Sequence, residues 1–300
     1  MLISLGLLAA VEACGSARQH AALGWSLGGE AHVFVADDRF ARDFYRELTG
    51  GGRLEDTLAT HALVALEPRA IRGATVLSAR GAAAARLTLV RFHTPQSCGS
   101  PALVTELVLA FPPGGASGRS TPPSHVTVVA LLDAPPLARG AGPQPKPLSQ
   151  RKSLELVNRL ATRAESRGSL LGSLTLDADK SADAGEVIAL SPGRYAVGLR
   201  ARFLVADDTL LVTAVAVTDT GAHNVHWVVR PVRSRLTNGM IASGKASRYS
   251  LRGAVARPDA APLLLLDEIA DVSPRDSRAS AVDAETGRVV ATQPLALRCP

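Results

Sequence analysis

Oxygen-bearing side chains alternate along one polar segment that lies between two strand-like runs of the sequence. The alternating positions are Asp177, Asp179, Ser181 and Asp183. Oxygen ligands at alternate positions are how a tight loop surrounds a hard cation such as Ca²⁺. However, Lys180 brings a positive charge among these ligands, and Ala182 stands where a sharp calcium loop needs glycine. We therefore expect a solvated turn and no cofactor, with Ca²⁺ bound by these four residues as the alternative.

The same segment resembles the D-x-D-x-[DS]-x-D loops of integrin-type β-propeller repeats and, more loosely, the EF-hand. Both resemblances imply a calcium-binding loop at residues 177–183. The sequence departs from each pattern. The motif is present as a single copy, whereas a propeller is built from repeated blades. The position of the final EF-hand glutamate is occupied by Ile188.

Ser149 and Lys152 have the S-x-x-K spacing of the penicillin-recognising serine hydrolases, in which helical spacing brings a lysine amine to a serine hydroxyl. Neither an S-D-N nor a K-T-G triplet follows them in the sequence. Ser149 also directly precedes an amphipathic run, where serine is a preferred helix cap. We expect Ser149 to cap a helix rather than to act as a nucleophile.

Two histidines, His223 and His226, are three residues apart. In a strand they would point to opposite faces, so joint binding of a metal would need a turn, which Gly221 allows. No nearby Cys, Asp or Glu completes a recognisable zinc set. Catalysis would instead require distant residues to converge, such as His125 or His226 with Asp267 or Glu268. Such a convergence would make the chain a hydrolase of envelope polymers.

The first sixteen residues, MLISLGLLAAVEACGS, join a short apolar run to a cysteine. Residues 1–11 carry no charge and are too few to span a bilayer as a stable helix, which is typical of a signal peptide. Val11, Ala13 and Cys14 resemble a bacterial lipobox. The resemblance implies that residues 1–13 are a signal peptide and that Cys14 is acylated and becomes the new N-terminus. The alternative is a buried N-terminal helix or strand.

Cys98 and Cys299 would remain as an even pair in an oxidising compartment. Cys299 is the penultimate residue, where an untethered terminus would fray. We expect a disulfide between the two cysteines. It would close a loop of about 200 residues and contribute roughly 5 kcal/mol at most in the chain-entropy model. The alternative is two unrelated free thiols.

The formal net charge of +6 does not indicate a nucleic-acid partner. The arginines are scattered among acidic residues rather than clustered, and only two Trp, three Tyr and six Phe are present in 300 residues. Nucleic-acid surfaces usually combine clustered basic residues with aromatic side chains for stacking. We expect a solvated surface of mixed charge.

The chain as a whole is expected to be β-rich α+β, because short apolar or alternating runs recur between turns. The short connections favour antiparallel pairing. A polar linker is expected before the first run. The expected strands cover residues 31–35, 61–66, 74–79, 86–92, 103–111, 126–132, 170–176, 187–190, 195–205, 210–218, 225–229, 247–255 and 263–267, followed by a hairpin through residues 284–287.

Two helices are expected, near residues 38–48 and 150–167. The apolar stripe of the second consists of Leu154, Val157, Leu160, Ala161 and Ala164. Proline excludes regular structure from residues 135–148, which we interpret as a linker. It would separate an N-terminal β-rich half (residues 14–134) from a half with one helix and antiparallel strands (residues 149–300).

These observations together favour an exported, lipid-anchored protein of the bacterial cell envelope, on the periplasmic side of a membrane or secreted. We expect a non-enzymatic binding or scaffolding role with a protein or envelope-polymer partner. The alternatives are the envelope-polymer hydrolase and a periplasmic protein that binds a small ligand.

Overall fold

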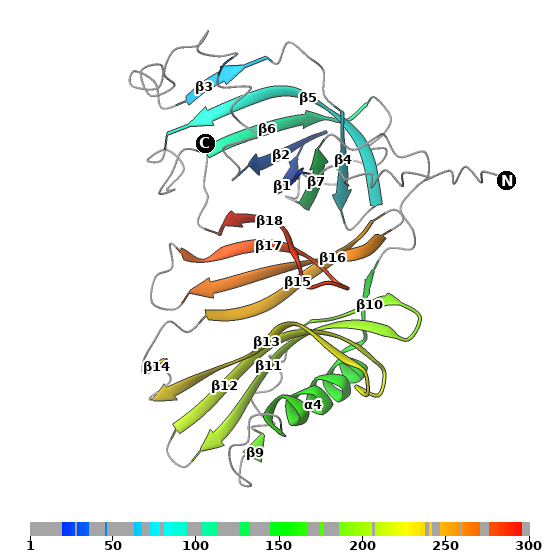
Figure 1. Cartoon of the computed structure of the whole chain (residues 1–300), viewed down its shortest axis with the longest axis vertical. Helices are drawn as coiled ribbons and strands as arrows, with labels where there is room; N and C mark the ends of the chain where they lie inside the picture. Colours follow the sequence, from blue (N-terminus) through cyan, green and yellow to red (C-terminus); the bar gives the residue numbers. More distant parts are fainter. Residues whose placement is uncertain are drawn as a thin grey trace, which may run out of the picture.

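The computed structural model describes residues 20–27, 29–35, 46, 63–67, 73–78, 81–94, 104–112, 126–132, 145–166, 175–176, 186–205, 208–237, 240–241, 247–257, 260–270 and 276–295. These residues form a β-rich, antiparallel structure of three sheets with the helix α4 (Gln150–Ser166). Figure 1 shows the elements as successive layers: a barrel at the top, a four-stranded sheet, a third sheet, and α4 at the bottom.

The first sheet closes into a barrel of six strands in the order β5-β4-β7-β1-β2-β6, because β6 also pairs with β5. A further strand, β3, extends the sheet by pairing with the end of β5. The strands are β1 (His20–Leu27), β2 (Glu30–Val35), β3 (Leu63–Leu66), β4 (Gly73–Ser78), β5 (Gly81–His93), β6 (Val104–Ala110) and β7 (Val126–Leu132).

Small side chains fill much of the barrel interior, which is narrow because so few strands close it. Ala22, Ala31 and Ala130 pack there beside larger residues such as Phe92. The backbones of β1 and β2 approach closely at Gly24, where an added Cβ would lie 1.8 Å from the carbonyl oxygen of His32. Only glycine therefore fits at this point of the barrel wall.

The middle sheet has the order β15-β16-β17-β18 and is covered on both faces. Leu263 and Leu265 pack with Leu23 and other residues of the barrel, whereas Leu264 and Leu266 pack against the third sheet. Successive side chains of a strand point to opposite faces, which explains four consecutive leucines in β16. The strands are β15 (Ser247–Arg257), β16 (Ala260–Ala270), β17 (Arg278–Asp283) and β18 (Val289–Pro294).

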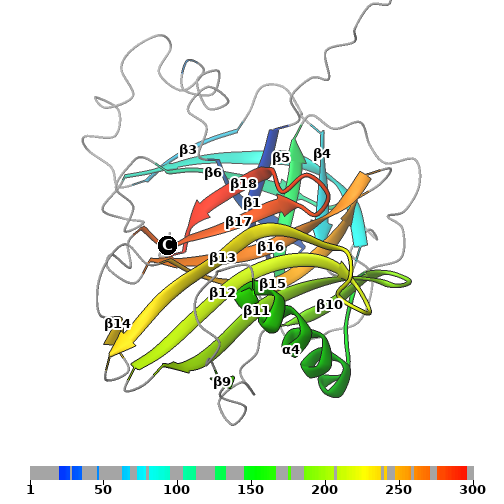
Figure 2. The ribbon, with the colours of Figure 1, turned by 60° about the horizontal axis from the view of Figure 1, so that its bottom comes forward.

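The third sheet has the order β14-β13-β12-β11-β10-β8, and β9 pairs with β11. One face packs on the middle sheet and α4 lies across the other (Figure 2). The strands are β8 (Lys146–Pro147), β9 (Thr175–Leu176), β10 (Val187–Ser191), β11 (Arg194–Val205), β12 (Asp208–Asp219), β13 (Val225–Thr237) and β14 (Met240–Ile241).

The prediction of the second helix is confirmed, with one correction to its apolar stripe. The helix begins directly after Ser149, whose carbonyl accepts a hydrogen bond from the Ser153 amide. Val157 and Leu160 are buried as expected, but Leu154 is 42% exposed. Leu156 occupies the buried face instead, because α4 presents a slightly different face to the third sheet than the stripe predicted.

The β-rich, antiparallel prediction is also confirmed for the strands that the structure describes. Two segments differ from expectation. The supposed polar linker contains β1, and the proline-rich segment contributes β8, in which Pro147 pairs with Ile188. β8 lies at the sheet edge, where proline is tolerated. The helix predicted near residues 38–48 lies outside the described residues apart from Arg46, which is helical.

Candidate functional site

Most of the residues singled out in the sequence lie outside the described residues. They are Cys14, Cys98, Cys299, Asp177, Asp179, Ser181 and Asp183. The lipidation, disulfide and calcium predictions therefore stay predictions. Within the described part of the chain, no group of three or more His, Cys, Asp and Glu side chains is arranged to hold a metal ion.

Of the residues named for a hydrolase, His125 lies outside the described residues, and no hydrogen bond or ion pair joins His226 to Asp267 or Glu268. His226 lines a hollow of about 750 Å³ beside the turn that follows β12. Asp267 is instead paired with Arg252, and Glu268 accepts a hydrogen bond from the Tyr249 hydroxyl at 2.9 Å. His223, the other histidine of the pair, lies in the turn itself.

That turn is organised by a carboxylate. Asp219 accepts hydrogen bonds from the backbone amides of Gly221, His223 and Asn224 at 2.9–3.1 Å. The amide of His223, followed by those of Asn224 and Gly221, lowers the pKa of Asp219 below its ordinary value, although partial desolvation opposes this. The carboxylate thus fixes the turn between β12 and β13.

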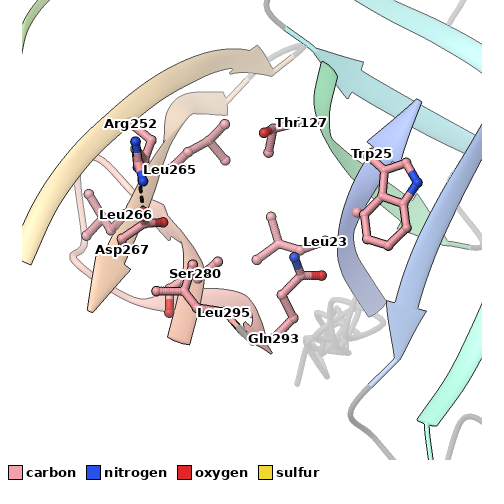
Figure 3. A pocket seen from close by; sticks show the side chains of 12 residues that line it. Leu23, Trp25, Thr127, Arg252, Leu265, Leu266, Asp267, Ser280, Gln293 and Leu295 are labelled. Atoms are coloured by element: carbon pink, nitrogen blue, oxygen red, sulfur yellow. Dashed lines mark hydrogen bonds and ion pairs between the residues drawn. The ribbon is translucent and has the colours of Figure 1, made fainter. Parts of the chain in front are cut away.

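A second hollow, with a volume of about 690 Å³, lies between the barrel and the middle sheet (Figure 3). We call it the interlayer pocket. Its walls come from β1 and β7 on the barrel side and from all four strands of the middle sheet. Its volume is within the range of small-molecule sites, which are frequent where two packed units meet.

The middle-sheet wall is a row of residues in register across three strands. Asp267 of β16 is opposite Ala279 of β17, which is opposite Gln293 of β18. The small side chain of Ala279 leaves space between two polar neighbours. Figure 3 shows Gln293 extending toward Leu23 of the barrel. The row lies just beyond the buried leucines of β16, so the apolar packing of the two layers ends where the pocket begins.

One charged pair borders this wall. The Nε of Arg252 donates a hydrogen bond to the Asp267 carboxylate. The Asp267 side chain is only 8% exposed, whereas the Arg252 side chain is 66% exposed. The buried carboxylate is thus compensated by a guanidinium that reaches from the pocket wall toward solvent, and the pair as a whole is neutral.

The barrel wall of the pocket carries Leu23, Trp25 and Thr127. Trp25 and Thr127 are directly opposite each other in the β1–β7 pairing. On its other side, Trp25 is opposite His32 of β2. The indole is stacked with the His32 ring at a centroid distance of 6.4 Å and lies 4.7 Å from the ring of Phe34. Cross-strand neighbours therefore position the aromatic wall.

A buried carboxylate in turn positions His32. Glu106 of β6 is 3% exposed and accepts a hydrogen bond from Nδ1 of His32 at 2.6 Å. Its other oxygen accepts one from Nε2 of His93 at 2.6 Å, and Arg91 approaches the first oxygen at 3.4 Å. We call these four residues the Glu106 cluster. Its hydrogen bonds connect β2, β5 and β6 on the outer face of the barrel.

The surroundings of Glu106 keep its carboxylate negatively charged. Burial raises the pKa of Glu106, but hydrogen bonds from His32 and His93, together with the charges of Arg91 and His93, outweigh it and lower the pKa to about 2. A carboxylate with so low a pKa is a weak base near neutral pH. The cluster is therefore suited to holding the His32 ring in place rather than to moving protons.

One polar atom of the pocket wall has no hydrogen-bond partner among the described protein groups. It is the buried Oε1 of Gln293. A buried acceptor without a donor costs about 1–3 kcal/mol. A ligand that donates a hydrogen bond at this position would recover that cost on binding.

This site could not be predicted from the sequence, for two reasons. The segment that contains Trp25 is predicted to be a linker, and the residues of the wall come from strands far apart in the sequence. One signal was present. Glu106 is a single charge within the apolar run of β6 (Val104–Ala110), and glutamate is rarely buried unless it is paired.

None of the helices in the described part of the chain is both long enough and apolar enough to cross a membrane. The comparisons with known proteins give no family for the chain: no family model, no curated protein and no solved structure matches it.

Proposed function

We propose that this chain is an exported, lipid-anchored envelope protein that binds a small ligand, without catalysis, in the interlayer pocket. The observation that carries the proposal is the pocket wall formed by Asp267, Ala279 and Gln293, whose side-chain Oε1 is buried and has no hydrogen-bond partner. Ligand sites combine a mainly apolar lining with a few well-placed polar groups, as this pocket does.

The charges around the pocket support binding rather than chemistry. Arg252 compensates Asp267, and the Glu106 carboxylate is held by three donors. Both carboxylates are therefore already engaged within the protein. Their arrangement provides fixed hydrogen-bonding positions and a fixed aromatic wall, which are the requirements for selective binding.

The lipid anchor rests on the lipobox resemblance of Val11, Ala13 and Cys14. Acylation of Cys14 would keep the barrel close to the membrane, since β1 begins at His20 and six residue steps span at most roughly 20 Å. We expect the wild-type chain to fractionate with membranes and Cys14→Ser to be released or left unprocessed. An intact, unmodified Met1 on protein from the native host would contradict the anchor.

The binding proposal is tested by ligand-induced stabilisation. A ligand at about 100 times its Kd stabilises the folded state by about 2.7 kcal/mol. We expect the low-molecular-mass fraction of host envelopes to raise the Tm of the purified full-length chain. Ala279→Phe, which places a large ring in the pocket, should abolish the rise.

A matched control separates the pocket from a general effect of an added phenyl ring. Val289 lies in the same sheet and is 55% exposed, so Val289→Phe adds the ring outside the pocket. This variant should respond to the fraction as the wild type does. An equal Tm rise in Ala279→Phe, or no rise in the wild type, would contradict binding in the interlayer pocket.

A further inference from the structure

The interlayer pocket offers hydrogen-bond acceptors, donors and an aromatic side chain together. Gln293 contributes a carbonyl oxygen without a protein donor, and Asp267 contributes a carboxylate. Arg252 contributes donors, and Thr127 contributes a hydroxyl that can act either way. Trp25 completes the set on the barrel side (Figure 3).

This combination selects against simple ions. A cation would meet the Arg252 guanidinium beside the carboxylate, and an anion would meet Asp267 beside the guanidinium. Because Asp267 and Arg252 carry opposite charges, an ion of either sign is attracted by one group and repelled by the other. A neutral ligand avoids this competition and can still hydrogen-bond to both groups.

The combination also selects against a purely apolar ligand. A lipid chain would supply no donor for the Oε1 of Gln293 and none beyond Arg252 for the Asp267 carboxylate. A ligand rich in hydroxyl groups supplies those donors. A sugar ring in addition presents C–H groups on one face, which pack on an indole such as that of Trp25.

We propose that the interlayer pocket binds a neutral saccharide, with its hydroxyl groups on Asp267, Arg252 and Gln293 and one ring face against Trp25. This inference rests on the proposed binding function and names the ligand class for the same pocket. The volume of about 690 Å³ accommodates a small oligosaccharide. The supporting Glu106 cluster fixes the indole through His32, so the aromatic wall is preorganised for the ring.

The test uses the fluorescence of Trp25. The chain has two tryptophans, so Trp227→Phe leaves Trp25 as the single reporter. The full chain with this substitution is titrated with chitotriose, maltotriose, cellobiose, lactose and mannobiose, each to about 10 mM, which detects Kd values in the millimolar range. Dodecanoate, dodecylamine and inorganic phosphate are titrated in parallel.

We expect at least one saccharide to change the Trp25 emission saturably. Asp267→Asn and Gln293→Leu should each weaken that binding about tenfold, the usual effect of losing one buried hydrogen bond. Glu268→Gln is the matched control. It lies next to Asp267 but on the opposite face of β16, where it contacts Tyr249 and not the pocket, so binding should be unchanged.

The outcomes separate the two proposals. Binding of dodecanoate, dodecylamine or phosphate without any saccharide would overturn the saccharide inference and leave the proposed pocket function intact. Saccharide binding that Asp267→Asn, Gln293→Leu and Ala279→Phe leave unchanged would place the sugar elsewhere and overturn the inference. Failure of every probe overturns the saccharide inference. The host-envelope Tm experiment decides the binding proposal independently of these probes.

Discussion

Glu106 is a carboxylate buried on the outer face of a barrel, and its neighbours account for its charge. Two imidazoles and a guanidinium approach its oxygens from β2 and β5. Burying a charge is costly unless it is paired and hydrogen-bonded, and the cluster meets both conditions. The same hydrogen bonds hold the His32 ring, which is stacked with Trp25. Glu106 therefore positions the aromatic wall of the pocket through His32.

The low pKa of Glu106 predicts a pH dependence of stability. Because the folded-state value of about 2 is below the ordinary 4.5, the stabilisation is present above pH 4.5 and is lost as the pH falls toward 2. The shift corresponds to about 3 kcal/mol. We expect Glu106→Gln to lower the free energy of unfolding near pH 7 by about that amount, measured by urea denaturation, and the difference from wild type to shrink between pH 4.5 and pH 2.

Glu30 provides the control for this prediction. Its carboxylate is 3.8 Å from His32 but 48% exposed, and exposed ion pairs contribute little. Glu30→Gln should therefore change the free energy of unfolding by less than about 1 kcal/mol. A difference between wild type and Glu106→Gln that stays constant across this pH range would contradict the assignment of the charge to the cluster.

The elements with a strong local pattern could be predicted from the sequence, whereas a strand without one could not. The amphipathic run of α4 and the four leucines of β16 carry strong local signals, and both elements were found. β1 was missed, because its sequence HAALGWSL mixes small, polar and apolar residues without alternation. It becomes a strand through its pairing with β2 and β7, and the β7 partner is about 100 residues away.

The candidate site depends on the same long-range pairing. The row of Asp267, Ala279 and Gln293 follows from the register of β16, β17 and β18, and the Glu106 cluster follows from the pairing of β6 with β2 and β5. No local pattern encodes these registers, so the strands of the middle sheet could be predicted from the sequence but the pocket that they form with the barrel could not.

The substitution Gly198→Ala tests how closely the third sheet packs on the middle sheet. A Cβ at this position in β11 would lie 2.8 Å from the Cβ of Leu251 and 3.1 Å from its amide nitrogen. Overpacking of this kind typically costs about 1–3 kcal/mol, so Gly198→Ala should lower the free energy of unfolding by that amount.

Gly253 is the control, since it is also a strand glycine of the middle sheet but lies beside Leu265, on the barrel side. Its added Cβ would meet only the Cδ1 of Leu265 at 3.8 Å, an ordinary contact. Gly253→Ala should be neutral or stabilise the protein by up to about 1 kcal/mol. Equal destabilisation by both substitutions in urea denaturation would contradict the close approach of the two sheets at Gly198.

At the scale of the whole molecule, the middle sheet connects the other layers. One of its faces packs on the barrel and the other on the third sheet, which α4 covers on its far side (Figure 1). Neither neighbour can unfold without exposing leucines of β16. The layers should therefore unfold together, although the barrel and the third sheet come from different halves of the sequence.

Two single-tryptophan variants measure this coupling. Trp227→Phe leaves Trp25 in the barrel, and Trp25→Phe leaves Trp227 in the third sheet. In each variant, we expect the urea midpoint by tryptophan fluorescence to coincide with the midpoint by far-UV circular dichroism, as two-state unfolding requires. Midpoints that separate in either variant would show that the layers unfold independently.

The central claim is that the interlayer pocket holds a small ligand, and native mass spectrometry of protein from its own host tests it most directly. The wild-type chain and Val289→Phe should carry an added small-molecule mass that is lost on denaturation, while Ala279→Phe should carry none. The same added mass on Ala279→Phe, or its absence from the wild type even after incubation with the host envelope fraction, would contradict the claim.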